Sequence, residues 1–191
     1  IQEDIHLTDI QIGLIATIFN LFYAVLVPLG GWLGDKVSRK WLIVGSLFVW
    51  SAVTYLMGYA ADFNQLLILR ASMGISEALY IPSALSLIAD WHEGKSRSLA
   101  IGIHMTGLYT GQAIGGFGAT LAAALSWQQA FHWFGIVGVV YSIVLILFLH
   151  EKSNHNKAEK PAPEVATKKA NPFAGLGIVL TNWAFWVILF Y

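Results

Sequence analysis

Residues 31–40 read GWLGDKVSRK and join two long apolar stretches, 12–33 and 41–61. Each stretch has about the length, roughly 20 residues, that a helix needs to cross the hydrocarbon core of a bilayer. The connection carries Lys36, Arg39 and Lys40, and such charges are rare inside a membrane helix. This segment therefore predicts two membrane-spanning helices joined by a short charged loop.

The same pattern extends outward along the chain. Three further apolar stretches occupy 66–89, 99–125 and 131–149. Of the 191 residues, 57% are hydrophobic and 12% are charged, and that charged share is about half that of an ordinary soluble domain. The apolar residues come in blocks and do not alternate as in a transmembrane barrel. The sequence predicts an all-α polytopic membrane protein with the lipid bilayer as its solvent.

The part of the chain after the fifth stretch has a different composition. Residues 151–171 are hydrophilic and rich in Lys, Glu, Pro and Ala, which is typical of a flexible linker. In 172–191, Thr181 and Asn182 offer a helix N-cap for a short apolar segment that starts at Trp183. We predict a transmembrane bundle over 1–150, a linker over 151–171 and the start of a second bundle over 172–191. Since the chain opens without Met and stops inside an apolar segment, we also expect a longer protein.

The positions of the basic residues predict the topology. Three follow the first stretch, two follow the third and five follow the fifth, whereas the connections around 62–65 and 126–129 have none. Loops rich in Lys and Arg stay on the cytoplasmic side, so residues 2–9 are expected outside. This predicts a multi-pass protein of the inner or plasma membrane. The basic loop residues are Lys36, Arg39, Lys40, Lys95, Arg97, Lys152, Lys157, Lys160, Lys168 and Lys169.

The remaining basic residue, Arg70, and one acid, Glu77, lie within the third stretch. Seven residues are two helical turns, so both side chains project from nearly one face, about 10 Å apart. A charge in hydrocarbon is costly, so both are expected to face a cavity or a partner. One interpretation is a structural pair that locks helices together. The favoured one is a functional site, in which Arg70 binds a carboxylate or phosphate through two hydrogen bonds and Glu77 exchanges a proton.

Other polar side chains in the stretches are candidates for the cavity wall. Asn20, Tyr23 and Tyr80 are predicted to bind substrate, although hydrogen bonds between helices would explain each of them alone. The same alternatives apply to His104, Tyr109 and Gln112 in the fourth stretch.

Several function classes find no support in the sequence. The chain has no cysteine, its histidines lack the spacing of metal ligands, and no phosphate-binding loop or nucleophile elbow is present. With a formal net charge of zero, nothing indicates a nucleic-acid partner. We therefore expect no enzyme activity, no cofactor and no metal.

Residues 31–40 resemble the signature loop between helices two and three of the major facilitator superfamily, G-x-L-x-D-[RK]-x-G-[RK]-[RK]. The resemblance implies that Asp35, Arg39 and Lys40 lock the closed cytoplasmic gate. Ser38 stands where the family has Gly, which is expected to make the turn less permissive. On this alignment the chain is a helical bundle of that superfamily covering helices two to six and the start of seven, without helix one.

The third stretch is similar to helix four of two groups, the spinster-like transporters and the anion:cation symporters. The matching residues are Arg70, Gly74, Glu77, Ala78, Tyr80, Pro82, Ile88, Ala89, Asp90 and Arg97. The resemblance links Arg70 with a substrate anion and Glu77 with a proton, and it adds Asp90 and Arg97 to the gating set. Residues 107–116 resemble an antiporter motif, but Gln112 replaces its Pro, so close helix packing is the favoured interpretation.

These observations predict a secondary active transporter that works by alternating access, is proton-coupled and carries an organic anion. It is expected to be a monomer in its full-length form. The alternatives are a spinster-like transporter of a lipid-like amphiphile, a non-transporting membrane receptor and a channel subunit. A membrane enzyme is the weakest of them, because no catalytic set is clustered.

Overall fold

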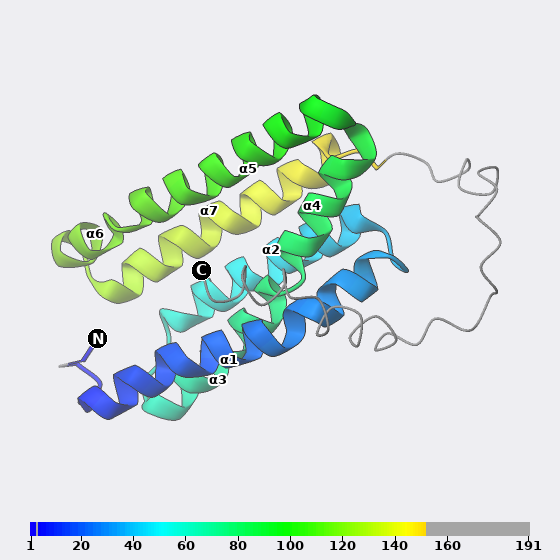
Figure 1. Cartoon of the computed structure of the whole chain (residues 1–191). Coiled ribbons are helices and arrows are strands. Elements are labelled where there is room, and N and C mark those ends of the chain that lie inside the picture. Colours follow the sequence, from blue (N-terminus) through cyan, green and yellow to red (C-terminus); the bar gives the residue numbers. More distant parts are fainter. Residues whose placement is uncertain (3, 152–191) are drawn as a thin grey trace. The chain divides into compact units, whose positions relative to one another are not determined.

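The computed structural model of the chain describes residues 1, 2 and 4–151. Within them the backbone forms helices and no strand, which confirms the predicted all-α class (Figure 1). The helices are α1 (Asp9–Gly34), α2 (Arg39–Met57), α3 (Phe63–Glu77), α4 (Tyr80–Trp91), α5 (Gly94–Gly115), α6 (Gly118–Ala124) and α7 (Trp127–Phe148).

In the described part, four helical segments are long and apolar enough to cross a membrane: Asp9–Gly34, Arg39–Met57, Phe63–Trp91 and Trp127–Phe148. Many of their large side chains point outward, among them Ile10, Val25 and Leu147, which are 78%, 61% and 68% exposed. Such a surface would be costly in water but is suited to lipid. The bilayer is therefore the natural surrounding of this bundle.

The prediction of one continuous span over 99–125 was wrong. The helix begins earlier, at Gly94, and ends at Gly115, and the short helix α6 follows. The break falls at a pair of glycines, which favour helix ends, and the Gly116 N–H caps the helix by bonding to the carbonyls of Gln112 and Ala113. With several glycines and polar residues, α5 is long enough to span but is not among the four apolar segments.

The third predicted span is interrupted between Glu77 and Tyr80, where α3 ends and α4 begins. Pro82 has no N–H to donate to the carbonyl of Ala78 four residues earlier, so the regular helix cannot continue there. At this break α1 comes very close, since a Cβ on Gly30 would lie 2.6 Å from the Ala78 carbonyl oxygen. The break places Glu77 at the end of one helix and Tyr80 at the start of the next.

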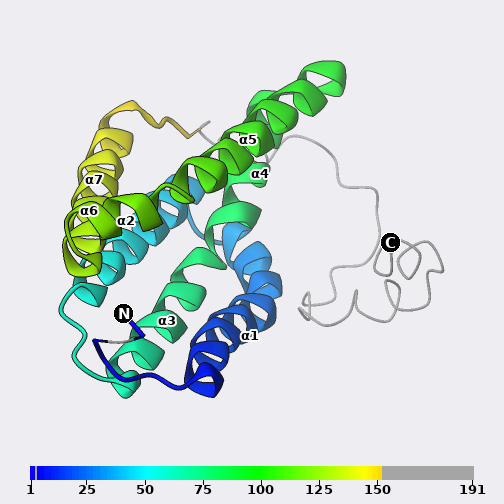
Figure 2. The same cartoon turned by 90° about the vertical axis from the view of Figure 1, so that its left-hand side faces the viewer.

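Three helix pairs, α1 with α3, α2 with α3 and α2 with α7, form the packed part of the bundle. Helix α1 lies along α3, where a Cβ on Gly74 would lie 2.5 Å from the Phe19 carbonyl oxygen. Helix α2 lies along both α3 and α7, and a Cβ on Gly135 would lie 2.5 Å from Tyr55 Cβ. By contrast, α5 has no buried residue and packs mainly against α4, away from α1 and α3 (Figure 2). One cavity is lined by residues of both α1 and α5.

The connections of the bundle gather at two ends (Figure 1). The α1–α2 loop, the α4–α5 loop and the end of α7 lie together at one end, which we call the basic end. The N-terminus and the α2–α3 and α6–α7 connections lie at the other. The alternation inferred from the basic residues is thus reproduced, while the membrane side that each end faces stays a prediction. Except for Glu151, the predicted linker and the segment 172–191 lie outside the described residues.

Candidate functional site

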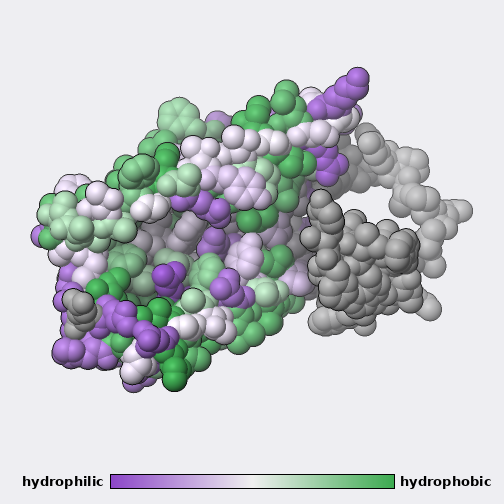
Figure 3. All heavy atoms as spheres, turned by 60° about the vertical axis from the view of Figure 1, so that its left-hand side comes forward, coloured by the Kyte–Doolittle hydropathy of each residue, from purple (hydrophilic) through white to green (hydrophobic). Residues whose placement is uncertain are grey.

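A cavity of about 990 Å³ lies among α1, α2, α3, α4, α5 and α7, and we call it the polar cavity. Four of the predicted site residues line it: Asn20, Tyr23, Glu77 and Tyr80. Figure 3 shows this face of the molecule hollowed, with hydrophilic side chains among hydrophobic ones. Residues from three helices, α1, α3 and α4, are thus brought to one surface.

A second cavity, of about 960 Å³, lies beside the first, and we call it the aromatic cavity. Arg70 lines it, together with Trp50, Phe131, Phe134 and Tyr141. The two cavities share wall residues, so they are neighbours within one open region. These shared residues are Leu47, Trp50, Gly111 and Tyr141.

Arg70 and Glu77 interact electrostatically, yet no ion pair within 4.0 Å joins them in the described part. The Arg70 side chain donates only a weak contact from Nη1 to Met73 Sδ, at 3.8 Å, and its buried Nε has no hydrogen-bond partner. The locking pair that the sequence left open is therefore not formed here. The guanidinium keeps most of its donors for another acceptor, such as an anion.

The neutral polar residues of the polar cavity also keep hydrogen-bonding capacity. Asn20 Nδ2 donates to the Ala16 carbonyl at 3.0 Å, which leaves the amide oxygen as an acceptor. The ring of Tyr23 stacks on Phe19 with centroids 6.1 Å apart, and the Tyr80 ring lies 5.9 Å from His104. Tyr109, a further candidate, is 61% exposed and lines neither cavity.

At the basic end, the gating residues predicted from the signature loop form a cluster around Arg39. Its guanidinium pairs with Asp90 of α4, lies 3.8 Å from Asp35, and donates from Nε to the Gly34 carbonyl at 3.3 Å. Lys40 donates to the Ile146 carbonyl of α7 at 2.8 Å. The signature loop is thereby connected to α4 and α7.

Arg97 is not brought into this cluster. Its side chain is exposed and makes no ion pair among residues 1, 2 and 4–151. Its gating role stays a prediction.

Ser38 does not strain the turn as expected. Its φ of −55° lies in the range open to any residue, and its hydroxyl caps α2 by accepting from Trp41 N at 3.5 Å. The same hydroxyl donates to the carboxylate of Glu151. The serine that stands in place of glycine thus makes two hydrogen bonds through its hydroxyl, one at the start of α2 and one to Glu151 after α7.

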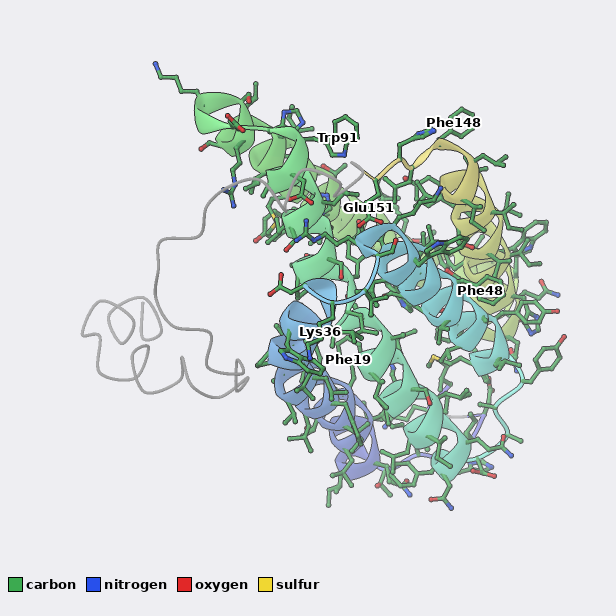
Figure 4. All side chains as sticks on the ribbon, turned by 90° about the vertical axis from the view of Figure 1, so that its right-hand side faces the viewer. Phe19, Lys36, Phe48, Trp91, Phe148 and Glu151 are labelled. Atoms are coloured by element: carbon green, nitrogen blue, oxygen red, sulfur yellow. The ribbon has the colours of Figure 1, made fainter. Side chains whose placement is uncertain are left out.

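Glu151 is a residue that sequence reasoning placed only at the start of the linker. Its carboxylate accepts from the Ser38 hydroxyl and, at 3.0 Å, from the Arg39 backbone N–H (Figure 4). Burial alone would raise the pKa of Glu151, but these bonds, a further one from the Lys40 backbone and the Arg39 charge outweigh it, and the net pKa is lowered. The only indication of this contact in the sequence was an acidic residue two positions after the apolar stretch 131–149.

We expect Glu151→Gln to lower the free energy of unfolding by about 1 kcal/mol near neutral pH, because a charged acceptor is lost from a helix N-terminus. Since the pKa is lowered by folding, this stabilisation is present above the pKa of the unfolded chain and is lost as the pH falls through the folded pKa. Thermal unfolding in detergent at decreasing pH measures the difference between variant and wild type.

The matched control is Glu93→Gln, which alters an exposed glutamate that makes no side-chain cap to α5. A destabilisation by Glu151→Gln that does not shrink in acid, or that Glu93→Gln reproduces, would refute the role of the Glu151 charge.

Metal binding finds no basis in the described part, because nowhere in it do three His, Asp or Glu side chains gather as ligands. The cavities instead present one guanidinium, one carboxylate, and hydroxyl, amide and imidazole groups.

A comparison with protein families decides the affiliation of the chain. Residues 1–191 match the model of the Major Facilitator Superfamily. The chain belongs to the major facilitator superfamily. With its apolar helices, this member of the superfamily is a multi-pass integral membrane protein of a transporter family.

Individual superfamily members agree with this affiliation. The hexuronate transporter of Bacillus subtilis (strain 168) is 30% identical over 168 residues, which are 87% of this chain and 40% of the relative. The protein spinster of Drosophila melanogaster is 29% identical over 164 residues, 82% of this chain and 27% of the relative.

A solved superfamily structure has the same fold. It is a bacterial homologue of the human lysosomal transporter spinster, in an inward-facing and unoccupied conformation. The TM-score is 0.72 at 27% sequence identity, covering 95% of this chain and 43% of that one. The chain thus spans less than half the length of each of these relatives.

Proposed function

We propose that the chain forms the substrate-binding half of a secondary active carrier that works by alternating access and couples a proton to the movement of an organic anion. The observation that carries the proposal is the position of Arg70 and Glu77 on the walls of adjacent cavities, with no ion pair between them. This chain covers less than half the length of the hexuronate transporter and of spinster, so the carrier is proposed for a longer polypeptide.

Arg70 would bind the anionic group of the substrate. A guanidinium offers two parallel donors to a carboxylate or phosphate, and the one hydrogen bond of the Arg70 side chain within the described residues is the weak one to Met73. Glu77 would exchange the proton. The two charges are about 10 Å apart along α3 but act on one another through the apolar interior, so a bound anion at Arg70 changes the field at Glu77.

A small hydroxylated anion, such as a sugar acid, is our first substrate class. The polar cavity offers neutral hydrogen-bonding groups from Asn20, Tyr23 and Tyr80, which suit hydroxyls. The hexuronate transporter among the relatives supports this class.

A lipid-like amphiphile, such as a lysolipid, is the second class. Beside Arg70, the aromatic cavity is lined by rings and small residues, including Trp50, Phe131 and Phe134, which suit an acyl chain. The spinster relatives support this class.

The rest of the predicted transporter follows the superfamily pattern. We propose that the basic end faces the cytoplasm, that Asp35, Arg39, Lys40 and Asp90 belong to its gate, and that the full-length carrier is a monomer in the bilayer. The Arg39–Asp90 pair and the Lys40–Ile146 bond support a rigid basic end on which a gate can close.

The test is uptake by liposomes that contain the full-length protein. With an acid outside, we expect accumulation of glucuronate that collapses when the proton gradient is dissipated, and competition by other small carboxylates. Uptake of lysophosphatidylglycerol without glucuronate uptake would favour the amphiphile class. Binding without flux would indicate a receptor, and flux that ignores substrate on the opposite side would indicate a channel; either outcome would overturn the carrier.

A further inference from the structure

The α5 wall of the polar cavity carries a histidine that the proposed transport cycle does not use. His104 lines this cavity together with Glu77 and Tyr80. Its ring faces that of Tyr80, with centroids 5.9 Å apart and planes inclined by 36°. This is a ring contact, so it does not satisfy the hydrogen-bonding nitrogens of the imidazole.

Neither ring nitrogen of His104 is hydrogen-bonded to another described residue, and Nε2 is fully buried. A buried nitrogen without a partner is unfavourable, and such groups call for an explanation in a native structure. The side chain as a whole is only half-buried and forms part of the cavity wall. A ligand in the polar cavity is thus in a position to provide the partner.

The groups around His104 indicate what kind of ligand group that would be. The polar residues on the facing elements are Asn20 and Tyr23 of α1, Tyr80 of α4 and Tyr141 of α7, with Gln112 on α5 itself. All are neutral donors and acceptors, and Glu77 at the end of α3 is the one charged side chain on this wall in the described part. Arg70, the cation, lines the neighbouring cavity.

We infer that His104 is a substrate-binding residue that hydrogen-bonds a hydroxyl group of the transported anion while Arg70 holds its acidic group. The inference rests on the proposed function and deepens it, because the two cavities would bind different parts of one substrate. An imidazole ring that donates at one nitrogen and accepts at the other suits a hydroxyl, which also does both. Specificity for hydroxylated over plain carboxylates would then arise at His104.

The experiment uses the full-length protein in detergent and two radiolabelled probes, glucuronate and hexanoate, which share a six-carbon carboxylate but differ in hydroxyl groups. His104→Phe retains a ring beside Tyr80 and removes both nitrogens. We expect it to weaken glucuronate binding about 10-fold, the loss expected for one hydrogen bond to a buried partner, and hexanoate binding less than about twofold. His104→Gln restores a donor and an acceptor and is expected to recover most of the loss.

Each other outcome counts against the inference. Equal weakening of both probes by His104→Phe would mean that the ring only shapes the cavity, and unchanged glucuronate binding would mean that it makes no contact. If His104→Phe fails to fold, the pair His104→Gln and His104→Ala decides, because the glutamine variant must keep the preference for glucuronate and the alanine variant must lose it. Arg70→Ala separates the two hypotheses: if it abolishes binding of both probes while His104→Phe changes nothing, the proposed anion-binding role of Arg70 stands and only the role of His104 falls.

Discussion

Replacing Glu77 with glutamine is expected to abolish uptake driven by the proton gradient and to leave exchange of substrate across the membrane in place. Glutamine has nearly the same shape and still accepts hydrogen bonds, but it cannot take up or release a proton at accessible pH. Because Glu77 lines the polar cavity and forms no ion pair in the described part, the change breaks no ion pair there. Accumulation should fall to the level reached without a gradient.

The measurement compares wild type and variant liposomes twice, once with an acid-outside gradient and once as exchange of labelled for unlabelled substrate. Glu93→Gln is the matched control, since it makes the same chemical change on an exposed side chain at the basic end. If Glu77→Gln accumulates substrate as wild type does, Glu77 is structural. The coupling group then has to be sought outside the described residues.

The second large effect is expected at Arg39, whose replacement by alanine should lower the free energy of unfolding by about 3 kcal/mol, the lower end for breaking a buried ion pair. Arg39 is only 8% exposed, and its guanidinium holds Asp90 of α4 and the Gly34 carbonyl at the end of α1. Removing it takes away the guanidinium that pairs with the Asp90 carboxylate, which is itself 26% exposed. Breaking an ion pair that is shielded from water is among the most destabilising effects of a single substitution.

Thermal unfolding of the purified protein in detergent measures this effect. Arg97→Ala is the control, because it removes the same side chain from an exposed position at the same end and should change stability by less than about 0.5 kcal/mol. Equal effects of the two variants would show that the Arg39–Asp90 pair contributes nothing specific. A reduced transport rate of Arg39→Ala at full stability would instead point to a role in gating alone.

The Arg39 cluster also shows how far the signature loop could be interpreted from sequence. Its pattern predicted that Asp35, Arg39 and Lys40 act together, and the pairing of Arg39 with Asp35 and Asp90 agrees with that grouping. The pattern did not predict Glu151, because this residue is more than a hundred positions away and only the packing of α7 along α2 brings it to the start of α2. The resemblance of the third stretch added Arg97, whose side chain is exposed.

Local composition predicted where membrane helices occur in the chain, but it did not predict the residues at which they begin and end. Continuous apolar composition identified the segments that became α1, α2, α3 with α4, and α7. Helix starts followed capping instead: Thr8 and Gln11 form a capping box, so the first helix begins at Asp9, three residues before the predicted start. The breaks at Ala78 and Gly116 depended on Pro82 and on paired glycines, whose effect a hydropathy window averages away.

Composition and spacing alone therefore established the membrane class, the order of the helices and the alternation of basic loops, because these are properties of single segments. Only the tertiary structure decided that Arg70 and Glu77 line separate neighbouring cavities, that His104 lines the same cavity as Glu77, and that Glu151 caps α2. The physical reason is that the packing of two helices depends on the positions at which their backbones can come close together. Gly30, Gly74 and Gly135 permit such approaches, and no single segment specifies which partner each of them meets.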